Sequence, residues 1–189
     1  MGDKAYEIKD ATYEELATVD MATEFRKKHK KTLVECPPQK IPLLEDALKL
    51  FLNQKEIRVS IQPKVDCVEE AIDIVNKLGI SHLVGFNDGN LEYMSAVKKL
   101  SPAIHVFWDR PANSAIDSDI KIAQERGFEA LVIRHDGITP EKIRKIKAAG
   151  LEAGAWTVND TEVMKQLLSM GIDRIYTDHP RQLIALKQQ

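Results

Sequence analysis

Residues 134–136 read Arg-His-Asp and directly follow an apolar run, so they gather side chains suited to acid–base chemistry. A histidine changes its charge close to neutral pH, and His135 can therefore serve as a general acid or base. His29 lies in a polar stretch and His105 within an apolar run, and neither has an evident acid–base partner. His135 is the catalytic candidate that residue types alone suggest.

A second group of charged residues is the basic run 26–31, which reads Arg-Lys-Lys-His-Lys-Lys. Such a run can bind phosphate, but a solvated loop has the same composition. The chain carries 27 basic and 29 acidic residues and 6% aromatic residues, which is not the balance of a nucleic-acid-binding protein. We therefore favour the solvated loop and expect no nucleic-acid partner.

The segments that must position these side chains repeat one pattern from Pro42 onward, in which a helical spacing of apolar residues is followed by a short apolar run. The expected helices are 42–52, 68–78, 91–100, 115–126, 139–149, 161–170 and 181–187. The expected strands are 58–62, 81–86, 104–108, 130–133, 153–158 and 174–177. Strands that alternate with helices and are apolar almost throughout predict a parallel sheet of about six strands.

Glycines mark the ends of four expected helices, because a left-handed backbone at this position costs glycine little. They are Gly79, Gly127, Gly150 and Gly171. Before Pro42 the pattern is weaker. Residues 12–16 match a capping box that opens a short helix, and residues 24–39 are polar, contain two adjacent prolines and indicate a loop.

Length and composition limit the number of domains, the possible membrane spans and the location of the protein. With 189 residues, of which 43% are hydrophobic and 30% charged, we expect one globular domain over 1–189, irregular over 1–40 and repetitive over 41–189. No apolar run approaches the roughly 18 residues of a membrane span. Cys36 and Cys67 form no disulfide framework or metal-type pair and slightly favour a reduced, cytoplasmic location. A secreted or periplasmic location stays open if a precursor segment was removed.

Several segments resemble the glycerophosphodiester phosphodiesterase family, and they stand in the family's order. The most specific are 155–159, Ala-Trp-Thr-Val-Asn, and 171–180, Gly-Ile-Asp-Arg-Ile-Tyr-Thr-Asp-His-Pro. The weaker matches are 10–16, 41–48, 61–64, and Gly85-Phe86 followed by Leu91. The resemblance runs from about Asp10 to the C-terminus.

This resemblance implies a TIM-type barrel of eight strands and the metal-dependent hydrolysis of glycerophosphodiesters to an alcohol and glycerol 3-phosphate. Six strands then predict an α/β fold of the incomplete TIM-type (β/α) barrel kind, with flanking helices. The family's catalytic groups are a His-Arg-Gly motif, a metal-binding Glu-x-Asp pair and a His-Asp pair, and none of these is in place here. Because residues 135–136 lie elsewhere in the chain than the family's His-Asp pair, the resemblance speaks against catalysis by His135.

The resemblance also assigns roles to four residues. Gln62 stands where the family has a metal-binding glutamate, which implies either a weakened ligand or a polar residue at the barrel mouth. Lys64 matches a lysine that faces the substrate, although a solvated loop lysine fits equally. Trp156 matches an apolar wall beside the glycerol part and Phe86 an aromatic at a strand end, with a core position as the alternative for both. The implied cofactor is Ca²⁺ or Mg²⁺, although this chain could also bind no metal.

Three functions are left open at this stage. The first is a phosphodiesterase-like protein of glycerophosphodiester metabolism, acting on a small-molecule phosphodiester, truncated or degenerate and therefore inactive or impaired as this chain alone. The alternative is a non-catalytic barrel that binds a phosphorylated small molecule or acts only through assembly, and the third is an unrelated barrel enzyme. Six parallel strands leave two unpaired edges. We expect a homodimer, another partner or an extra strand from residues 4–9 to cover them.

Overall fold

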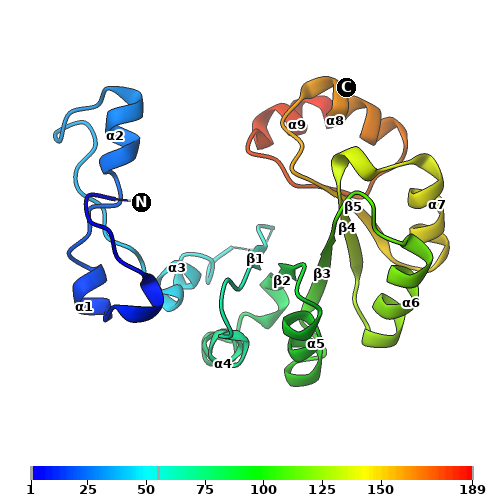
Figure 1. The fold of residues 1–189 in the computed structure, drawn as a ribbon, viewed down its shortest axis with the longest axis horizontal. Helices are drawn as coiled ribbons and strands as arrows, with labels where there is room; N and C mark the ends of the chain where they lie inside the picture. The colour runs from blue at the N-terminus through cyan, green and yellow to red at the C-terminus, as the bar shows by residue number, and fades with distance from the viewer. Residues whose placement is uncertain (1, 55, 189) are drawn as a thin grey trace. The chain divides into compact units, whose positions relative to one another are not determined.

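Six short strands form one parallel sheet in the computed structural model, which describes residues 2–54 and 56–188. The strands follow one another in chain order across the sheet (Figure 1). They are β1 (Val59–Ile61), β2 (Val84–Asp88), β3 (His105–Arg110), β4 (Ala130–Arg134), β5 (Glu152–Trp156) and β6 (Arg174–Ile175). Each pairs in parallel with the next, which confirms the predicted sheet.

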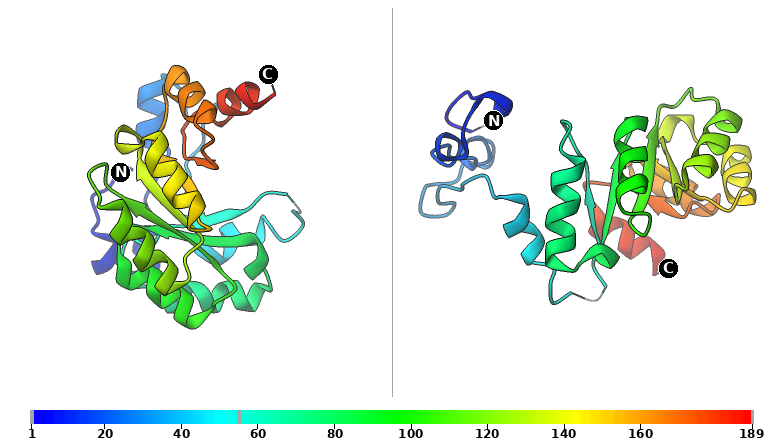
Figure 2. Two further views of the ribbon diagram at one scale, coloured as in Figure 1. Left: turned by 90° about the vertical axis from the view of Figure 1, so that its right-hand side faces the viewer. Right: turned by 90° about the horizontal axis from the view of Figure 1, so that it is seen from below.

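Helices connect the strands and flank the curled sheet, so the α/β half-barrel expected from the sequence is confirmed (Figure 2). They are α4 (Val68–Leu78), α5 (Leu91–Leu100), α6 (Ile116–Arg126), α7 (Pro140–Ala148), α8 (Thr161–Ser169) and α9 (Pro180–Lys187). Two of them end at a glycine in the left-handed region, Gly79 at φ 68° and Gly127 at φ 71°, as their place after the last helical turn predicts.

The two faces of the sheet differ because successive side chains of a strand point to opposite sides. Fully buried apolar side chains gather between the strands and the helices, and Phe86, Val106, Leu131 and Ile133 are each 0% exposed. On the inner face, Phe107, Ala130 and Val132 form a buried cluster against which Trp156 and Tyr176 pack. Polar side chains are interspersed on the inner face, and these are the ones that can meet a ligand.

All six strands differ from the predicted bounds by one to three residues at one or both ends, and β2 and β3 show the two kinds of difference. Residues Ser81–Leu83 form a 3-10 helix, and β2 starts only at Val84. Strand β3 continues through Asp109 and Arg110, two residues beyond the last apolar side chain. Apolar pattern alone located the centre of each strand but not its polar end.

The chain divides into two units, Met1–Ala47 and Leu48–Gln189, and the sheet belongs to the second. We call them unit 1 and unit 2. In unit 1 the short elements are η1 (Ile8–Asp10), α1 (Tyr13–Leu16) and α2 (Thr23–His29), and α3 (Leu44–Lys49) begins near its end. The prediction of a single domain stays a prediction.

The capping box expected at residues 12–16 is present. The Glu15 N–H donates to the Thr12 hydroxyl at 3.3 Å, and the Thr12 N–H donates to the Glu15 carboxylate at 2.8 Å. The two other expectations for this part are wrong. Helix α2 occupies part of the expected loop 24–39, and the residues from Lys4 to Lys9 form no strand.

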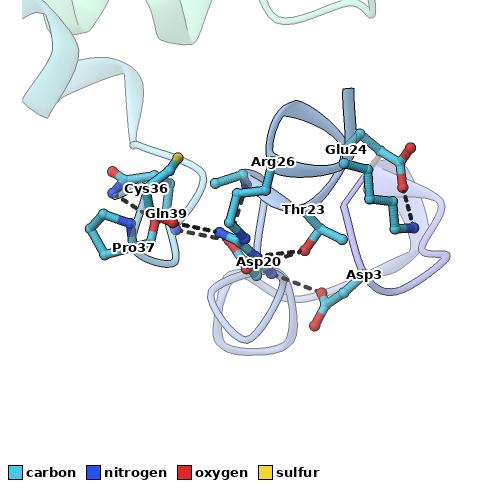
Figure 3. Close-up of polar contacts among 10 residues, drawn as sticks. Asp3, Asp20, Thr23, Glu24, Arg26, Cys36, Pro37 and Gln39 are labelled. Atoms are coloured by element: carbon cyan, nitrogen blue, oxygen red, sulfur yellow. Dashed lines mark hydrogen bonds and ion pairs between the residues drawn. The ribbon is translucent and has the colours of Figure 1, made fainter. Parts of the chain in front are cut away.

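Asp20 explains why a helix forms in the polar stretch (Figure 3). One of its carboxylate oxygens accepts from the Ala22 and Gln39 N–H groups, both at 3.0 Å. The other accepts from the Thr23 hydroxyl at 3.1 Å and pairs with the Arg26 guanidinium. These bonds satisfy a donor at the start of α2 and connect the helix to the segment that follows it.

The basic run 26–31 is partly neutralised by acidic side chains of the same unit. Arg26 pairs with Asp20, and its guanidinium also donates to the Cys36 carbonyl at 3.0 Å. Lys27 pairs with Glu24 at 2.8 Å and Lys31 with Glu35 at 3.3 Å. These pairs agree better with a folded, solvated segment than with a phosphate-binding patch.

In the described parts of the chain, no helix is both long and apolar enough to cross a membrane.

Candidate functional site

The ends of four strands or their loops surround a cavity of about 340 Å³ in unit 2. We call it the carboxyl-edge cavity, because parallel strands bring their carboxyl ends to the same edge of a sheet, where barrel sites are built. Its lining residues lie directly after β1 and β2, at or directly after the end of β3, and at the end of β5. They are Gln62, Gly89, Asp109, Arg110, Pro111 and Trp156.

Asp109 is the unusual side chain of this cavity. The Ser60 hydroxyl donates to the Asn87 amide oxygen at 2.7 Å, and the Asn87 amide donates to one Asp109 oxygen at 3.0 Å. The other Asp109 oxygen is buried and has no hydrogen-bond partner in the described structure. A polar chain thus crosses three neighbouring strands and ends at an under-satisfied carboxylate.

Burial raises the pKa of Asp109 to about 6, since the ionised form loses the solvation it has in water. The hydrogen bond from Asn87 opposes this shift, as does the positive charge of Lys64, while the negative charge of Asp88 adds to it. Lys64 therefore acts electrostatically on the cavity. Asp109 holds a proton more readily than an exposed aspartate would.

Gln62 and Lys64 follow β1, with the buried Pro63 between them, and both side chains are exposed. Gln62 lines the carboxyl-edge cavity, and Lys64 is close enough to influence the ionisation of Asp109. The structure thus brings these two predicted residues to one place. Their roles as metal ligand and substrate-binding cation stay predictions.

Trp156 ends β5 and lines the same cavity. Its indole N–H donates to the Val132 carbonyl at 3.0 Å, which fixes the ring over the inner-face cluster. A partly exposed ring held in one orientation offers an apolar wall to a ligand. This arrangement is compatible with the predicted role, and part of the ring also packs like a core residue.

Phe86 lies apart from these residues. It is 0% exposed and pairs in register with Ile61 and Val106. The next residue, Asn87, takes part in the inner-face polar chain, so the alternation of β2 directs Phe86 to the opposite side. The structure places Phe86 in the core and outside the cavity lining, which leaves its predicted contact with substrate without support.

His135 opens a short 3-10 helix after β4 and does not line the carboxyl-edge cavity. Both carboxylate oxygens of Asp136 accept from the Arg134 guanidinium, each at 2.7 Å. This pairing lowers the pKa of Asp136 and raises that of Arg134. Asp136 is thus engaged chiefly by Arg134, and a catalytic role for His135 stays a prediction.

The donors of the carboxyl-edge cavity do not fit Ca²⁺ or Mg²⁺. These ions take about six or more oxygen ligands, preferably charged ones. Here the donors are the neutral Gln62 amide and the Asp109 carboxylate, whose pKa is raised, and Lys64 adds positive charge. Across residues 2–54 and 56–188, no group of three or more His, Cys, Asp and Glu side chains is placed to hold a metal ion.

A larger cavity of about 700 Å³ is lined by residues in or before β1, β2 and β3 and by residues in or directly after β6. Its polar lining includes Arg58, His82, His105, Arg174 and Tyr176. Arg174 is already engaged, because its guanidinium lies 3.9 Å from the centre of the Phe107 ring and pairs with Glu152 at 2.5 Å. Burial raises the pKa of Tyr176 to about 12, so this phenol is neutral at physiological pH.

Sequence reasoning missed Asp109, Asn87 and Ser60. Asp109 stands at the end of the apolar run 104–108, and a charged residue there is a recognisable signal of a strand-end site. Ser60 and Asn87 gave no comparable signal, since a serine and an asparagine are common at any strand or turn.

Comparison with known proteins relates this chain to one family. Residues 1–182 match the glycerophosphoryl diester phosphodiesterase family. A glycerophosphodiester phosphodiesterase of Bacillus altitudinis is 26% identical over 195 residues, covering 96% of this chain and 74% of the relative. A glycerophosphodiester phosphodiesterase of Caldanaerobacter subterraneus is 25% identical over 185 residues, covering 95% of this chain and 72% of the relative.

Solved structures show the same fold. One is a phosphodiesterase of Oleispira antarctica in complex with the product sn-glycerol-3-phosphate, with a TM-score of 0.75, 19% identity, and coverage of 100% of this chain and 75% of that chain. Another, from Silicibacter pomeroyi, gives a TM-score of 0.82 at 17% identity, covering 99% of this chain and 72% of that chain. On the match over residues 1–182, the chain belongs to the glycerophosphoryl diester phosphodiesterase family.

Proposed function

We propose that this chain binds a glycerophosphodiester, or the glycerol phosphate part of one, in the carboxyl-edge cavity and does not hydrolyse it efficiently as residues 1–189 alone. The observation that carries the proposal is the content of that cavity. It combines a cation within electrostatic range, an apolar ring and polar acceptors, but only one carboxylate. This is a set of groups that can bind a phosphoester and lacks the charge to hold a divalent cation.

In this arrangement each residue has one task. Lys64 would attract the phosphate oxygens, since an ammonium forms strong hydrogen bonds to ionised acceptors. Trp156 would contact the carbon chain of the alcohol with its ring. Gln62 would offer an amide that both donates and accepts hydrogen bonds.

Hydrolysis needs more than this. A base must activate the nucleophile, an acid must protonate the leaving alkoxide, and a cation must stabilise the charge on the phosphoryl oxygens. Neither the His-Arg-Gly motif nor the Glu-x-Asp pair occurs anywhere in these 189 residues. Since each acid–base group contributes about 10²- to 10⁴-fold in rate, a chain without them should be slower by several orders of magnitude.

The test combines hydrolysis and binding. Glycerophosphocholine with Ca²⁺ or Mg²⁺ is followed by phosphorus NMR in the presence of the purified chain, with a complete family member such as the Bacillus altitudinis relative as the positive control. We expect no release of glycerol 3-phosphate above the rate without protein, and calorimetric binding of glycerol 3-phosphate. Turnover at the rate of the positive control would overturn the claim of inactivity, and absence of binding would overturn the claim of a ligand site.

A second candidate function is assembly. In the described sheet, β1 and β6 each pair with a strand on one side only, and such edges favour pairing with another strand. A second copy or a partner that supplies strands would cover them. Size-exclusion chromatography with light scattering on the purified chain tests this candidate. We expect the mass of a dimer, and the mass of a monomer at every concentration would contradict assembly with a second copy.

A further inference from the structure

The carboxylate of Asp109 has acceptor capacity that the described residues do not use. An ionised carboxylate offers about four acceptor positions on its two oxygens. Here one oxygen accepts from Asn87 at 3.0 Å, and the other is buried without any partner. A buried acceptor left unpaired costs free energy, so an incoming donor is favourable.

The groups around Asp109 restrict what that donor can be. Asp109 lines the carboxyl-edge cavity together with Gln62 and Trp156, so a molecule held there lies beside the residue whose buried oxygen has no partner among the described residues. A phosphate carries negative charge and no strong donor near neutral pH, so it is repelled by an ionised carboxylate and attracted instead by Lys64. A neutral hydroxyl group is the part of a phosphoester that can donate to Asp109.

We propose that Asp109 is a specificity-determining residue of the carboxyl-edge cavity, where its carboxylate accepts a hydrogen bond from a hydroxyl group of the ligand and so selects polyol phosphates over alkyl phosphates. The inference rests on the proposed function, since it presumes that a phosphoester occupies this cavity. It adds the residue that recognises the hydroxyl groups of the alcohol part.

The geometry supports a selective contact because the carboxylate is held in place. Asn87 bonds to Asp109 and is itself held by the Ser60 hydroxyl at 2.7 Å. An acceptor fixed by such a chain loses little freedom when it binds a hydroxyl group. A site built to bind a hydroxyl group also discriminates strongly against an analogue that lacks it, because the acceptor is then left unpaired.

The experiment compares two probes that differ only in hydroxyl groups, glycerol 3-phosphate and n-propyl phosphate. Binding of each to the full chain is measured by calorimetry at pH 7.5, where Asp109 is ionised. We expect the wild type to prefer glycerol 3-phosphate by about tenfold or more, as a hydrogen bond to a charged group implies. In Asp109→Ala the preference should disappear, while the affinity for n-propyl phosphate should stay the same or rise.

Two further variants serve as controls. Asp109→Asn keeps an acceptor oxygen without the charge, and we expect an intermediate preference; it also stands in if the alanine variant is unfolded by circular dichroism. Asp136→Asn removes an exposed carboxylate of the neighbouring loop, which is paired with Arg134, and should leave the preference unchanged.

The outcomes separate the two proposals. If the wild type binds both probes equally, or if both Asp109 variants keep the full preference, the role of Asp109 is overturned while the phosphoester site stands. If the wild type binds neither probe, the proposed function fails, and the role of Asp109 fails with it.

Discussion

Asp20 in unit 1 and Asp109 in unit 2 are both largely buried aspartates, but they differ in how many hydrogen-bond donors surround the carboxylate. The Asp20 carboxylate is saturated, and its pKa is lowered, chiefly by the hydrogen bond from Arg26. The Asp109 carboxylate receives one hydrogen bond, and burial raises its pKa to about 6. A saturated carboxylate joins parts of the chain to one another, whereas an under-satisfied one at a cavity is available to a ligand.

The two aspartates also differ in how far along the sequence their hydrogen-bond donors lie. The donors of Asp20 come from nearby positions and from the segment that follows α2, so they form with the local fold. They are the N–H groups of Ala22 and Gln39, the Thr23 hydroxyl and the Arg26 guanidinium. Among the described residues, Asp109 has one donor, which lies on the neighbouring strand, 22 positions away. Charged residues next to one another in sequence are thus poor guides to a site, and the polar end of a strand is a better one.

The largest effect is expected from Asp20→Ala. The substitution removes the acceptor for four donors and leaves the Arg26 guanidinium, whose side chain is 11% exposed, without its carboxylate. Unit 1 should lose its structure while the sheet of unit 2 persists. Limited proteolysis should show cleavage within residues 20–40 accelerated about tenfold or more, because cleavage follows the population of open states.

Glu24→Ala is the matched control, since it removes an exposed carboxylate of the same helix, paired with Lys27. Its cleavage pattern should match the wild type. Equal resistance of Asp20→Ala would show that the Asp20 cluster does not hold unit 1 together.

The second effect concerns Asp109→Asn and pH. Because the folded state binds the Asp109 proton more tightly than the unfolded state, this group's contribution to stability is greatest at low pH and is lost as pH rises from its ordinary pKa of 3.8 to about 6. Asparagine cannot ionise, so the variant should be more stable than the wild type by about 2 to 3 kcal/mol at pH 7.

Urea unfolding of both proteins between pH 3.5 and 7.5 measures the difference in their free energies of unfolding. The titration of the other carboxylates contributes equally to both proteins and drops out of this difference. The difference should be near zero at the acid end and level off above pH 6, with Lys64 and Asp88 as the charged neighbours that adjust the midpoint. A difference that is constant with pH would contradict the raised pKa.

A smaller effect is expected from Lys64→Met, which removes the cation expected to attract phosphate oxygens. The affinity for glycerol 3-phosphate should fall about tenfold, as loss of one charge-assisted hydrogen bond implies. The midpoint of the Asp109 titration should also move to higher pH, since Lys64 lowers that pKa. Lys121→Met, on the exposed surface of α6, is the control and should change neither quantity.

The smallest effect is expected from Gln62→Glu, which introduces the carboxylate that the family resemblance predicts at this position. Two carboxylates and few other ligands should bind Ca²⁺ with a millimolar Kd, which corresponds to about 1 kcal/mol of stabilisation at 10 mM Ca²⁺. The wild type should show no such stabilisation in thermal unfolding. Equal stabilisation of both proteins by Ca²⁺ would mean that the amide already serves as a ligand.

The fold could be predicted from the sequence because its signals are local and repeated. Helical spacing, a glycine such as Gly79 at a helix end and apolar runs located all six strands of the described sheet. The candidate site could be predicted from the sequence only in part. Gln62, Lys64 and Trp156 were identified through resemblance, whereas Asp109 depends on which side of β3 a residue faces and on the neighbour it meets across the sheet.

The same reasoning explains the errors. Helix α2 is not evident from the composition of residues 24–39, because the bonds that stabilise it converge on Asp20, which precedes this segment. Phe86 was assigned to the site through resemblance to an aromatic at a strand end, yet the strand continues to Asp88 and its alternation buries the ring.

A crystal structure of the chain with glycerol 3-phosphate tests the central claim most directly, because it shows which of the two cavities described above holds the ligand. We predict the phosphate beside Lys64 and the glycerol hydroxyl groups at Asp109 in the carboxyl-edge cavity of about 340 Å³. A ligand bound instead among Arg58, His82 and His105 in the cavity of about 700 Å³ would contradict the account.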